Sequence, residues 1–333
     1  MAMFIKRYAG NPVLSAADIP YPASLIFNAG VCKFNGKYVM VFRNDVGFSK
    51  KGVTEPPYTQ LGIAFSDDGI HWEPQGSPWK TPLKIVESNP EFHHFYDPRL
   101  TVIDGRCYLC FAVDTYSGVR GGIAVTDDFD NFEVLSISAP DNRNMVLFPE
   151  KINGKFYRLE RPFPVYSTGG EFFDIWGAAS PDCRYWGENK LILSYKQVPF
   201  SNRKIGPGAP PVKTDAGWLT LFHAVKIHKD KVLDGWEQAD NPNALWRKEY
   251  FAGIMLLDLE DPSRIIGISE EPLIRAECDC EVHGYRGSVI FPGGMILEDS
   301  GEVKIYYGAA DTVECLATAE VGDLIRLCSK LSH

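Results

Sequence analysis

One short element recurs five times along the chain and limits the folds that are possible. The copies are at residues 35–43, 104–112, 153–161, 215–223 and 300–307. The first reads Asn-Gly-Lys-Tyr-Val-Met-Val-Phe-Arg, a glycine-containing turn followed by an apolar and aromatic run that is typical of a β-strand. Imperfect copies spread over the whole chain indicate repeated sheets in one architecture.

A second signature follows three of these copies, at residues 66–72, 126–132 and 180–186. Each is a polar hairpin turn that ends in an aromatic residue. The two signatures alternate, which favours five sheets arranged radially over the alternative, a β-sandwich with unrelated hairpins. We therefore expect an all-β fold, a five-bladed β-propeller, in which residues 1–333 form a single catalytic domain.

Two segments do not fit the repeat. Residues 226–249 are polar and contain a proline, so we expect a long insertion loop that could rim a pocket or make a subunit contact. Residues 321–331 have apolar spacing that suits a short C-terminal helix.

Charge and composition exclude several classes of protein. The net charge of −9 argues against a general binder of nucleic acid or of membrane surfaces. The start of the chain is too short and too charged for a signal peptide, and no apolar run approaches a membrane span. Most of the eight cysteines lie in apolar, strand-like runs, and neither they nor the histidines have zinc spacing. We expect reduced cysteines, no metal and a cytoplasmic location.

Asp97 is the candidate catalytic acid, within the sequence His93-His94-Phe95-Tyr96-Asp97-Pro98-Arg99. Because a proline follows Asp97, its backbone is expected to be extended, at the mouth of a strand. The neighbouring aromatic residues can exclude water, and a carboxyl group in such a place can have a raised pKa and hold a proton for use. An Asx turn before a proline is the structural alternative.

Charged residues end several of the repeated strands, where apolar residues would be usual. The set contains Arg43, Asp45, Arg161, His223 and Asp311. In a propeller, loops from every blade meet around one mouth, so these residues are expected to converge. Charges in such places are costly without a purpose, either an ion-pair network along the axis or a ligand site.

Two further basic residues suggest what such a ligand could be. Arg143 stands just before an apolar strand, and Lys204 precedes a stiff loop of glycine and proline at residues 205–211. Two arginines offer forked donors to phosphate oxygens and a lysine adds a point charge, so Arg143, Arg161 and Lys204 together predict an oxyanion pocket.

With these residues in this order, the chain resembles glycoside hydrolase family 130, the β-mannoside phosphorylases and their relatives, over nearly its whole length. The pieces that carry the resemblance include Phe27-Asn28-Ala29-Gly30, Phe42-Arg43-Asn44-Asp45, Tyr96-Asp97-Pro98-Arg99, Asn142-Arg143, Arg161-Pro162, Lys204-Ile205-Gly206-Pro207-Gly208 and Tyr306-Tyr307-Gly308-Ala309-Ala310-Asp311. Their order along the chain is what makes the likeness specific.

The resemblance implies a five-bladed propeller that cleaves a β-mannosyl oligosaccharide with inorganic phosphate, with inversion, to give α-mannose 1-phosphate. Phosphate is then a co-substrate and no cofactor is implied. Asp97 matches the general acid of the family. The phosphate-binding positions are Arg143, Arg161, Lys204, His223 and Tyr250, and the positions that hold the mannosyl unit are Asn28, Arg43, Asp45, Tyr96 and Asp311. The linkage, the acceptor sugar and self-association stay open at this stage.

Physical chemistry supports the phosphorylase interpretation. Inverting hydrolysis needs a second carboxylate to activate water, whereas phosphate is already an anionic nucleophile. One acid, Asp97, beside a cationic cluster therefore indicates phosphorolysis. The alternatives are a β-mannosidase, which is expected to have lost the basic cluster, and a non-catalytic carbohydrate-binding propeller. A furanosidase is disfavoured because the chain lacks an N-terminal Asp-Pro-Asn-Gly motif, and a protein-interaction platform would not need charges at strand ends.

Overall fold

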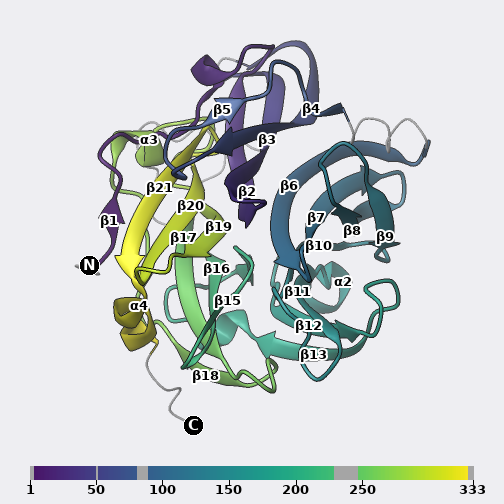
Figure 1. The fold of residues 1–333 in the computed structure, drawn as a ribbon, viewed down its shortest axis with the longest axis vertical. Helices are drawn as coiled ribbons and strands as arrows, with labels where there is room; N and C mark the ends of the chain where they lie inside the picture. Colours follow the sequence, from purple (N-terminus) through teal and green to yellow (C-terminus); the bar gives the residue numbers. More distant parts are fainter. Residues whose placement is uncertain (1–3, 50–51, 81–88, 229–246, 329–333) are drawn as a thin grey trace.

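The computed structural model shows five antiparallel sheets arranged around a central axis as the blades of a propeller (Figure 1). It describes residues 4–49, 52–80, 89–228 and 247–328. The expectation of an all-β, five-bladed propeller is confirmed. None of the helices in this described part of the chain has both the length and the apolar character of a membrane span.

The first three blades each contain four strands, connected in order from the axis outwards. Blade 1 contains β2 (Leu25–Phe34), β3 (Lys37–Ser49), β4 (Gly52–Ser66) and β5 (Glu73–Pro74). Blade 2 contains β6 (Phe92–Ile103), β7 (Arg106–Thr115), β8 (Gly118–Thr126) and β9 (Glu133–Ile137). Blade 3 contains β10 (Asn142–Leu147), β11 (Phe156–Pro162), β12 (Ile175–Ser180) and β13 (Gly187–Leu193).

The last two blades depart from this plan. Blade 4 contains β14 (Lys204–Pro207), β15 (Val212–Thr214), β16 (Gly217–His228), β17 (Arg247–Leu257) and β18 (Ile265–Ile268), and both β14 and β15 pair with β16. Blade 5 contains β19 (Ile290–Leu297), β20 (Glu302–Ala309), β21 (Val313–Glu320) and, as its outer strand, the N-terminal β1 (Lys6–Arg7). Because Lys6 pairs with Thr318, the first strand of the chain completes the last blade and closes the ring.

The repeated turn-strand element is the second strand of each blade. In blades 1 to 3, its turn is Asn-Gly or Asp-Gly with both residues at positive φ, as at Asn35 and Gly36. This geometry matches the twist of the two flanking strands, so the inner and second strands form a tight hairpin. The second signature is the turn between the third and fourth strands. There, Thr126 Oγ1 accepts from Phe129 N (2.9 Å) and Asp128 Oδ1 accepts from Asn131 N (2.8 Å).

The helices that lie wholly within the described residues are short and lie outside the blades. They are η1 (Ala16–Asp18), α2 (Val165–Thr168), η2 (Tyr195–Gln197), α3 (Asp279–Val282) and α4 (Val321–Leu327). The helix expected over 321–331 is present but ends at Leu327, where Cys328 leaves the helical conformation; its buried Leu324 packs on the cluster between blades 4 and 5. Residues 329–331 lie outside the described part of the chain.

The insertion loop expected at 226–249 is shorter than predicted, because residues at both of its ends belong to strands. Lys226 pairs with Glu249 and His228 pairs with Arg247, so the strands β16 and β17 continue into it. A polar segment can form a strand when its partner supplies the backbone hydrogen bonds, and a hydrogen bond between His228 Nε2 and Glu249 Oε2 (2.8 Å) links the two strands here. The central part, residues 229–246, lies outside the described residues.

An apolar cluster fills each space between neighbouring blades. Between blades 3 and 4, the fully buried Trp218 packs edge-on against Phe148 with ring centroids 5.3 Å apart. Among the described residues, the cluster between blades 2 and 3 has fewer buried members than the other four. Truncating a residue such as Trp218 to alanine would cost about 3–5 kcal/mol of stability.

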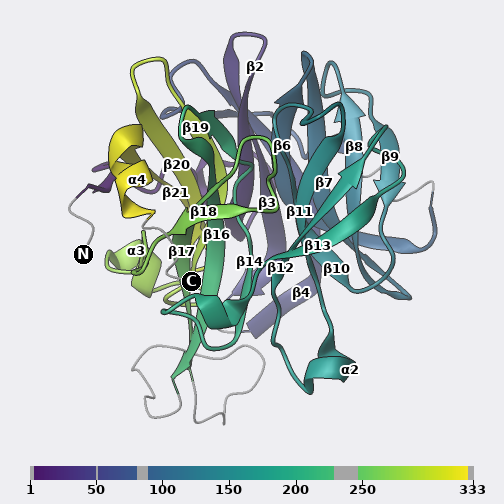
Figure 2. The same ribbon diagram turned by 90° about the horizontal axis from the view of Figure 1, so that it is seen from below.

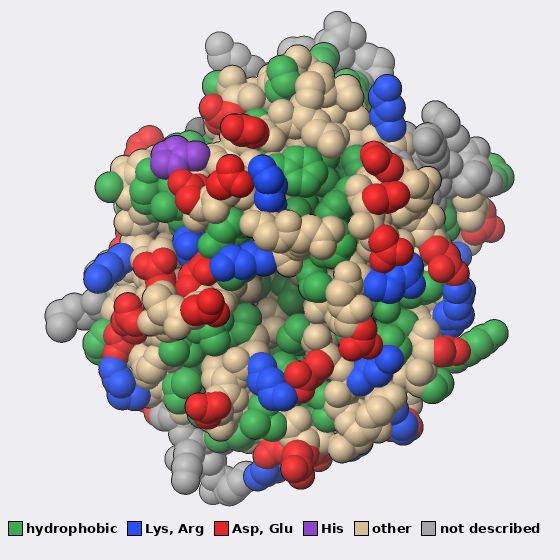
Figure 3. All heavy atoms as spheres, in the orientation of Figure 1, with side chains coloured by type: hydrophobic (Ala, Val, Ile, Leu, Met, Phe, Trp, Pro, Cys, Tyr) green, Lys and Arg blue, Asp and Glu red, His purple; other side chains and the backbone are tan. Residues whose placement is uncertain are grey.

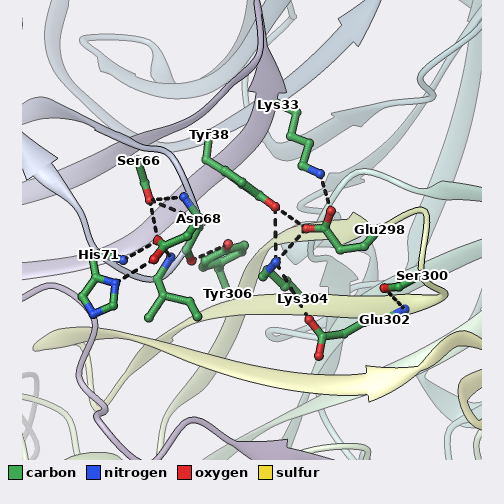
Figure 4. Close-up of polar contacts among 12 residues, drawn as sticks. Lys33, Tyr38, Ser66, Asp68, His71, Glu298, Ser300, Glu302, Lys304 and Tyr306 are labelled. Atoms are coloured by element: carbon green, nitrogen blue, oxygen red, sulfur yellow. Dashed lines mark hydrogen bonds and ion pairs between the residues drawn. The ribbon is translucent and has the colours of Figure 1, made fainter.

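A polar network at the closing seam joins blade 5 to blade 1 (Figure 4). Lys304 Nζ donates to Glu298 Oε1 (2.8 Å) and to Tyr38 OH (3.2 Å), and Glu298 also accepts from Tyr38 OH and Lys33 Nζ. Tyr306 OH donates to Gly69 O (2.7 Å) beside it. Burial disfavours the charged form of Glu298, but the hydrogen bonds from Lys304, Lys33 and Tyr38 outweigh it and lower its pKa to about 2.

Replacing Glu298 with glutamine is expected to lower the free energy of unfolding by about 1 kcal/mol at pH 7. Since the folded pKa lies below the usual value of 4.5, this stabilisation is present above about pH 4.5 and is lost as the pH falls towards 2. Denaturant unfolding at several pH values measures it. Glu302→Gln is the matched control, because Glu302 Oε1 is 3.9 Å from Lys304 Nζ and its side chain is only half-buried. Equal losses in both variants would contradict the role of Glu298.

The face of the molecule in Figure 3 carries basic and acidic side chains that are intermingled rather than segregated by sign. Exposed ion pairs of the molecule include Arg106 with Asp127 and Lys151 with Asp104. Figure 2 shows α2 at the opposite end of the propeller axis from the turn that joins β2 to β3. The strand ends near α2 are those that carry Arg143 and Arg161.

Candidate active site

The inner strands of four blades are interrupted by bulges near the axis. The register shifts lie between Phe27 and Gly30, Tyr96 and Arg99, Arg143 and Val146, and Pro292 and Gly294. Asn28, Asp97 and Asn144 lie within three of these bulges, with φ values of 55°, 51° and 58°. A bulge changes the direction in which a side chain leaves a strand, so one repeated irregularity turns residues of several blades towards the same point.

The prediction of an extended backbone at Asp97 is wrong, because its φ is 51°. Pro98 keeps Asp97 out of the right-handed helical region, as expected, but the bulge in β6 places it in the left-handed region. Aspartate tolerates that region better than most residues because its short polar side chain can bond locally.

These bulges surround a pocket of about 100 Å³ on the axis. Its lining comprises Phe27, Asn28, Arg43, Asp97, Arg143, Asn144, Arg161, Lys204, Tyr250, Arg286, Val289, Phe291 and Asp311. Basic side chains outnumber the two carboxylates, Asp97 and Asp311, so the pocket is suited to an anionic ligand.

Asp97 lies between the two sides of this pocket. It is 8% exposed, and its Oδ1 accepts a hydrogen bond from Asn28 Nδ2 (2.9 Å). Arg43 Nη1 is 3.8 Å from the same oxygen. The Asp97 charge also acts on Arg143 and Arg161, so this single carboxyl group is within electrostatic reach of all three arginines.

The basic side of the pocket is formed by Arg143, Arg161 and Lys204. Arg161 is 2% exposed, and its Nε and Nη2 have no hydrogen-bond partner among the described residues. Burial and the neighbouring Arg143 lower the pKa of Arg161 to about 9. Burial and Arg161 lower the pKa of Lys204 to about 7, although Glu171 binds its Nζ at 3.0 Å. Buried cations with unused donors are costly, and a bound anion would relieve that cost.

His223 lies directly behind Arg161 and is fully buried. Its Nε2 is 2.9 Å from Arg161 Nη1, which can only donate, and its Nδ1 is 3.2 Å from Pro207 O. The ring is therefore neutral, with the proton on Nδ1, and burial together with Arg161 holds its pKa well below the usual value. His223 orients the guanidinium group and adds no charge to the pocket.

The other side of the pocket combines Arg43 with Asp311. The Asp45 carboxylate binds Arg43 through two hydrogen bonds, from Nε (2.8 Å) and from Nη2 (2.7 Å). Asp45 also accepts a hydrogen bond from Thr59 Oγ1 (2.7 Å). Burial raises the pKa of Asp311 to about 6, opposed by Arg286 and Arg43. A carboxylate and a guanidinium group together offer both acceptors and donors, as the hydroxyl groups of a sugar require.

Comparison with known proteins identifies the family. The family model described as beta-1,4-mannooligosaccharide phosphorylase matches residues 5–330. A 1,2-beta-oligomannan phosphorylase from Thermoanaerobacter sp. (strain X514) is 32% identical, with 96% of this chain and 98% of the relative covered. The chain belongs to glycoside hydrolase family 130.

Other members of family 130 are similar to the chain over comparable lengths. A beta-1,4-mannooligosaccharide phosphorylase from Ruminococcus albus is 31% identical and covers 96% of this chain and 90% of its own length. The solved structure of a beta-1,2-mannobiose phosphorylase from Listeria innocua with beta-1,2-mannobiose has a TM-score of 0.80 at 26% identity and covers 98% of this chain and 99% of its own.

The structure brings together the site residues that the sequence and the family 130 likeness predicted, in two layers. Asp97, Arg143, Arg161, Lys204, Tyr250, Asn28, Arg43 and Asp311 line the pocket. Asp45, His223 and Tyr96 lie behind the lining instead. Asp45 holds Arg43, His223 holds Arg161, and Tyr96 OH accepts from Arg143 Nη1 (3.3 Å) while donating to Asp114 (2.8 Å). Their place indicates positioning of the arginines rather than contact with a ligand.

Sequence reasoning missed Arg286 and Asn144, both of which line the pocket. Arg286 lies in the connection between α3 and β19, and its Nη1 is 3.6 Å from Asp311 Oδ2. No strand-end pattern marks it. Asn144 had a readable signal, because it directly follows Arg143 and asparagine is common at the left-handed position of a bulge.

Of the segment 205–211, expected as a stiff loop, residues 205–207 belong to the inner strand β14, whereas residues 208–211 lie outside the strands. Gly206 pairs with His223, and a Cβ atom at Gly206 would lie 2.5 Å from His223 Cε1 and 2.9 Å from Arg161 Cδ. Only glycine leaves room there for the hydrogen-bonded His223 and Arg161 side chains. The Gly-Pro composition that suggested a loop therefore reflects close packing against the basic side of the pocket.

Arg99 supports the floor of this family 130 site. It is 1% exposed and donates to four backbone carbonyls, which belong to Pro98 (2.7 Å), Gly208 (2.7 Å), Asn28 (3.2 Å) and Pro292 (3.4 Å). These acceptors come from blades 1, 2, 4 and 5. One guanidinium group thus ties the inner parts of four blades together, two residues along the chain from Asp97.

Proposed function

We propose that this protein cleaves β-mannosides by inverting phosphorolysis, with Asp97 as the only acid and with Arg143, Arg161 and Lys204 as the phosphate site. Family membership makes the chain a β-mannoside phosphorylase. The residue roles rest on the geometry of the pocket. The observation that carries them is the buried basic cluster, with unused Arg161 donors, facing one hydrogen-bonded carboxyl group.

The proposed reaction follows from that arrangement. Phosphate bound to Arg143, Arg161 and Lys204 would lie beneath the anomeric carbon of the mannosyl unit, already charged and oriented for attack. Asp97 would supply a proton to the departing sugar, and the positive charge that develops on the mannosyl ring would be met by phosphate. Arg43 and Asp311 would hold mannosyl hydroxyl groups on the other side. No residue has to activate water.

The direct test is the release of sugar from a β-mannobiose with and without inorganic phosphate. Phosphorolysis predicts α-mannose 1-phosphate as the product and a rate near zero in phosphate-free buffer. Equal release in the two buffers, with free mannose as the product, would establish the hydrolase alternative instead. Reverse synthesis from α-mannose 1-phosphate with a panel of acceptor sugars then assigns the linkage, since the named relatives act on both β-1,2 and β-1,4 mannosides.

The phosphate affinity is expected to depend on pH through Lys204. Because its pKa is lowered to about 7, the empty site loses this positive charge as the pH rises through 7. A Lys204→Arg variant keeps its charge over this range. The ratio of the phosphate KM of the native enzyme to that of Lys204→Arg should therefore rise several-fold between about pH 6 and 8.5. The titration of phosphate itself cancels in the ratio. Parallel pH profiles would contradict the role of Lys204.

A further inference from the structure

A second cavity, separate from the catalytic pocket, lies between blades 2 and 3. It has a volume of about 620 Å³, and its lining includes Ser136, Asn142, Arg158, Glu160, Trp176 and Trp186. The apolar cluster of blades 2 and 3 fills only the part of this space around Ile103, Tyr108 and Leu147. The remainder is a groove, at which the lining residue Arg184 of blade 3 forms an ion pair with Glu133 of blade 2.

The groove contains a buried polar group of three residues. Arg158 Nη2 is 2.7 Å from Glu160 Oε2, and these residues are only 6% and 5% exposed. Asn142 Nδ2 donates to the same carboxylate at 2.9 Å. Arg158 Nε and Asn142 Oδ1 have no hydrogen-bond partner within the described part of the chain. The two residues that bind Glu160 thus bury one unused donor and one unused acceptor, which costs stability unless a ligand or water satisfies them.

Two tryptophans provide the apolar surface of the groove. Trp176 pairs with Glu160 in the β11–β12 register, so both side chains are on the same face of the sheet. The Trp186 ring lies 4.3 Å from the Arg158 guanidinium carbon and is held there by a bond from its Nε1 to Cys183 O (3.2 Å). Both tryptophans are half-buried rather than covered.

The groove and the catalytic pocket lie on opposite faces of the same two strands. Asn142 and Glu160 line the groove, whereas the next residues along each strand, Arg143 and Arg161, line the pocket. Successive side chains of a strand point to opposite faces, so only the thickness of the β10–β11 sheet separates the two sites.

We infer that this groove binds a β-mannosyl chain longer than the disaccharide at the catalytic pocket. A sugar ring presents an apolar face, which suits Trp176, and neutral hydroxyl groups that donate and accept, which suit Asn142, Arg158 and Glu160. The opposite charges of Arg158 and Glu160 compensate each other, so the groove does not select for an ion. The identity of the sugar rests on the proposed function, whereas the existence of the site rests on the groove itself.

The test is a titration of the protein with β-1,4-mannotetraose and with its β-1,2-linked isomer, by calorimetry in phosphate-free buffer. We expect one of the two to bind at a second site in addition to the catalytic pocket. Trp176→Ala should weaken binding at that second site by about tenfold. The kcat/KM for the disaccharide should stay within about twofold of the native value, because Trp176 does not touch the pocket.

Tyr185→Ala is the matched control, because Tyr185 is a 77% exposed aromatic residue beside Trp186 that is not in the groove lining. Trp176→Phe keeps a smaller aromatic face and should give an intermediate loss even if Trp176→Ala does not fold. A single binding site in the native protein, or tetrasaccharide binding by the Trp176 variants that matches Tyr185→Ala, would overturn the proposal. Calorimetry without phosphate measures binding in the groove even if the protein never forms mannose 1-phosphate. A failure of the groove proposal can therefore be distinguished from a failure of the proposed phosphorolysis.

Discussion

Replacing Asp97 with asparagine is expected to lower the kcat of phosphorolysis by about 10³-fold, the typical contribution of a positioned general acid. The variant should fold normally, because an asparagine oxygen at position 97 can still accept the hydrogen bond from Asn28 Nδ2. Its KM values should change little, since the lost proton matters in the transition state rather than in ground-state binding. Steady-state kinetics with a β-mannobiose and phosphate measures the effect.

The leaving group supplies a sharper form of this test. The leaving group of a nitrophenyl β-mannoside is nitrophenolate, which departs without being protonated. Asp97→Asn should therefore cleave this substrate at a rate within about tenfold of the native enzyme. Asp104→Asn is the control, because Asp104 is an exposed aspartate paired with Lys151 and does not line the pocket. If Asp97→Asn kept most of its activity on mannobiose, or if the nitrophenyl substrate failed to restore the rate, Asp97 would not be the acid.

Replacing Arg143 with alanine is expected to raise the KM for phosphate by about 100-fold, because a charge-assisted hydrogen-bond donor to the anion is removed. Arg143 is suited to this test because its hydrogen bond to Tyr96 OH is long (3.3 Å). Its loss should disturb the fold less than the loss of Arg99, which donates to four backbone carbonyls, or of Arg161, which binds His223 at 2.9 Å. The KM for the mannoside should stay within about threefold of the native value, since Arg43 and Asp311 lie on the other side of the pocket.

Arg106→Ala provides the control for this substitution. Arg106 is an exposed arginine paired with Asp127 and lies outside the pocket lining, so its loss should leave both KM values unchanged. Phosphate saturation of Arg143→Ala at native concentrations would remove Arg143 from the proposed phosphate site. A parallel rise in both KM values would instead indicate a general disturbance of the pocket.

The repeated sheets could be predicted because their signals are local. An Asn-Gly or Asp-Gly turn fixes a hairpin through the backbone preferences of two residues, and a Thr126-x-Asp128 turn fixes the next connection through side-chain acceptors. The copy of the second turn in blade 4 was missed. There, Asp258 Oδ1 accepts from Glu260 N (3.0 Å) and Asp261 N (2.9 Å), but no serine or threonine precedes it at the matching position.

The closure of the ring had no comparable signal. The pairing of Lys6 with Thr318 and the contact of Glu298 with Tyr38 join residues from opposite ends of the chain. The two residues of β1 are too few to show a strand pattern, and the sequence around Glu298 does not distinguish it from an exposed glutamate. Such pairings become favourable only once the intervening blades have brought the ends of the chain together.

The amino-acid sequence by itself determined the number of blades, the second strand of each blade and most of the residues that meet at the axis. Only the tertiary structure decided which of these residues line the pocket and which, such as Asp45 and His223, stand behind it to orient an arginine. The bulges that turn Asn28, Asp97 and Asn144 inwards decide this, and so does the contact of Arg99 with carbonyls of four blades. A bulge depends on its partner strand and on neighbouring blades, so its direction is a property of the assembled ring rather than of any local stretch of residues.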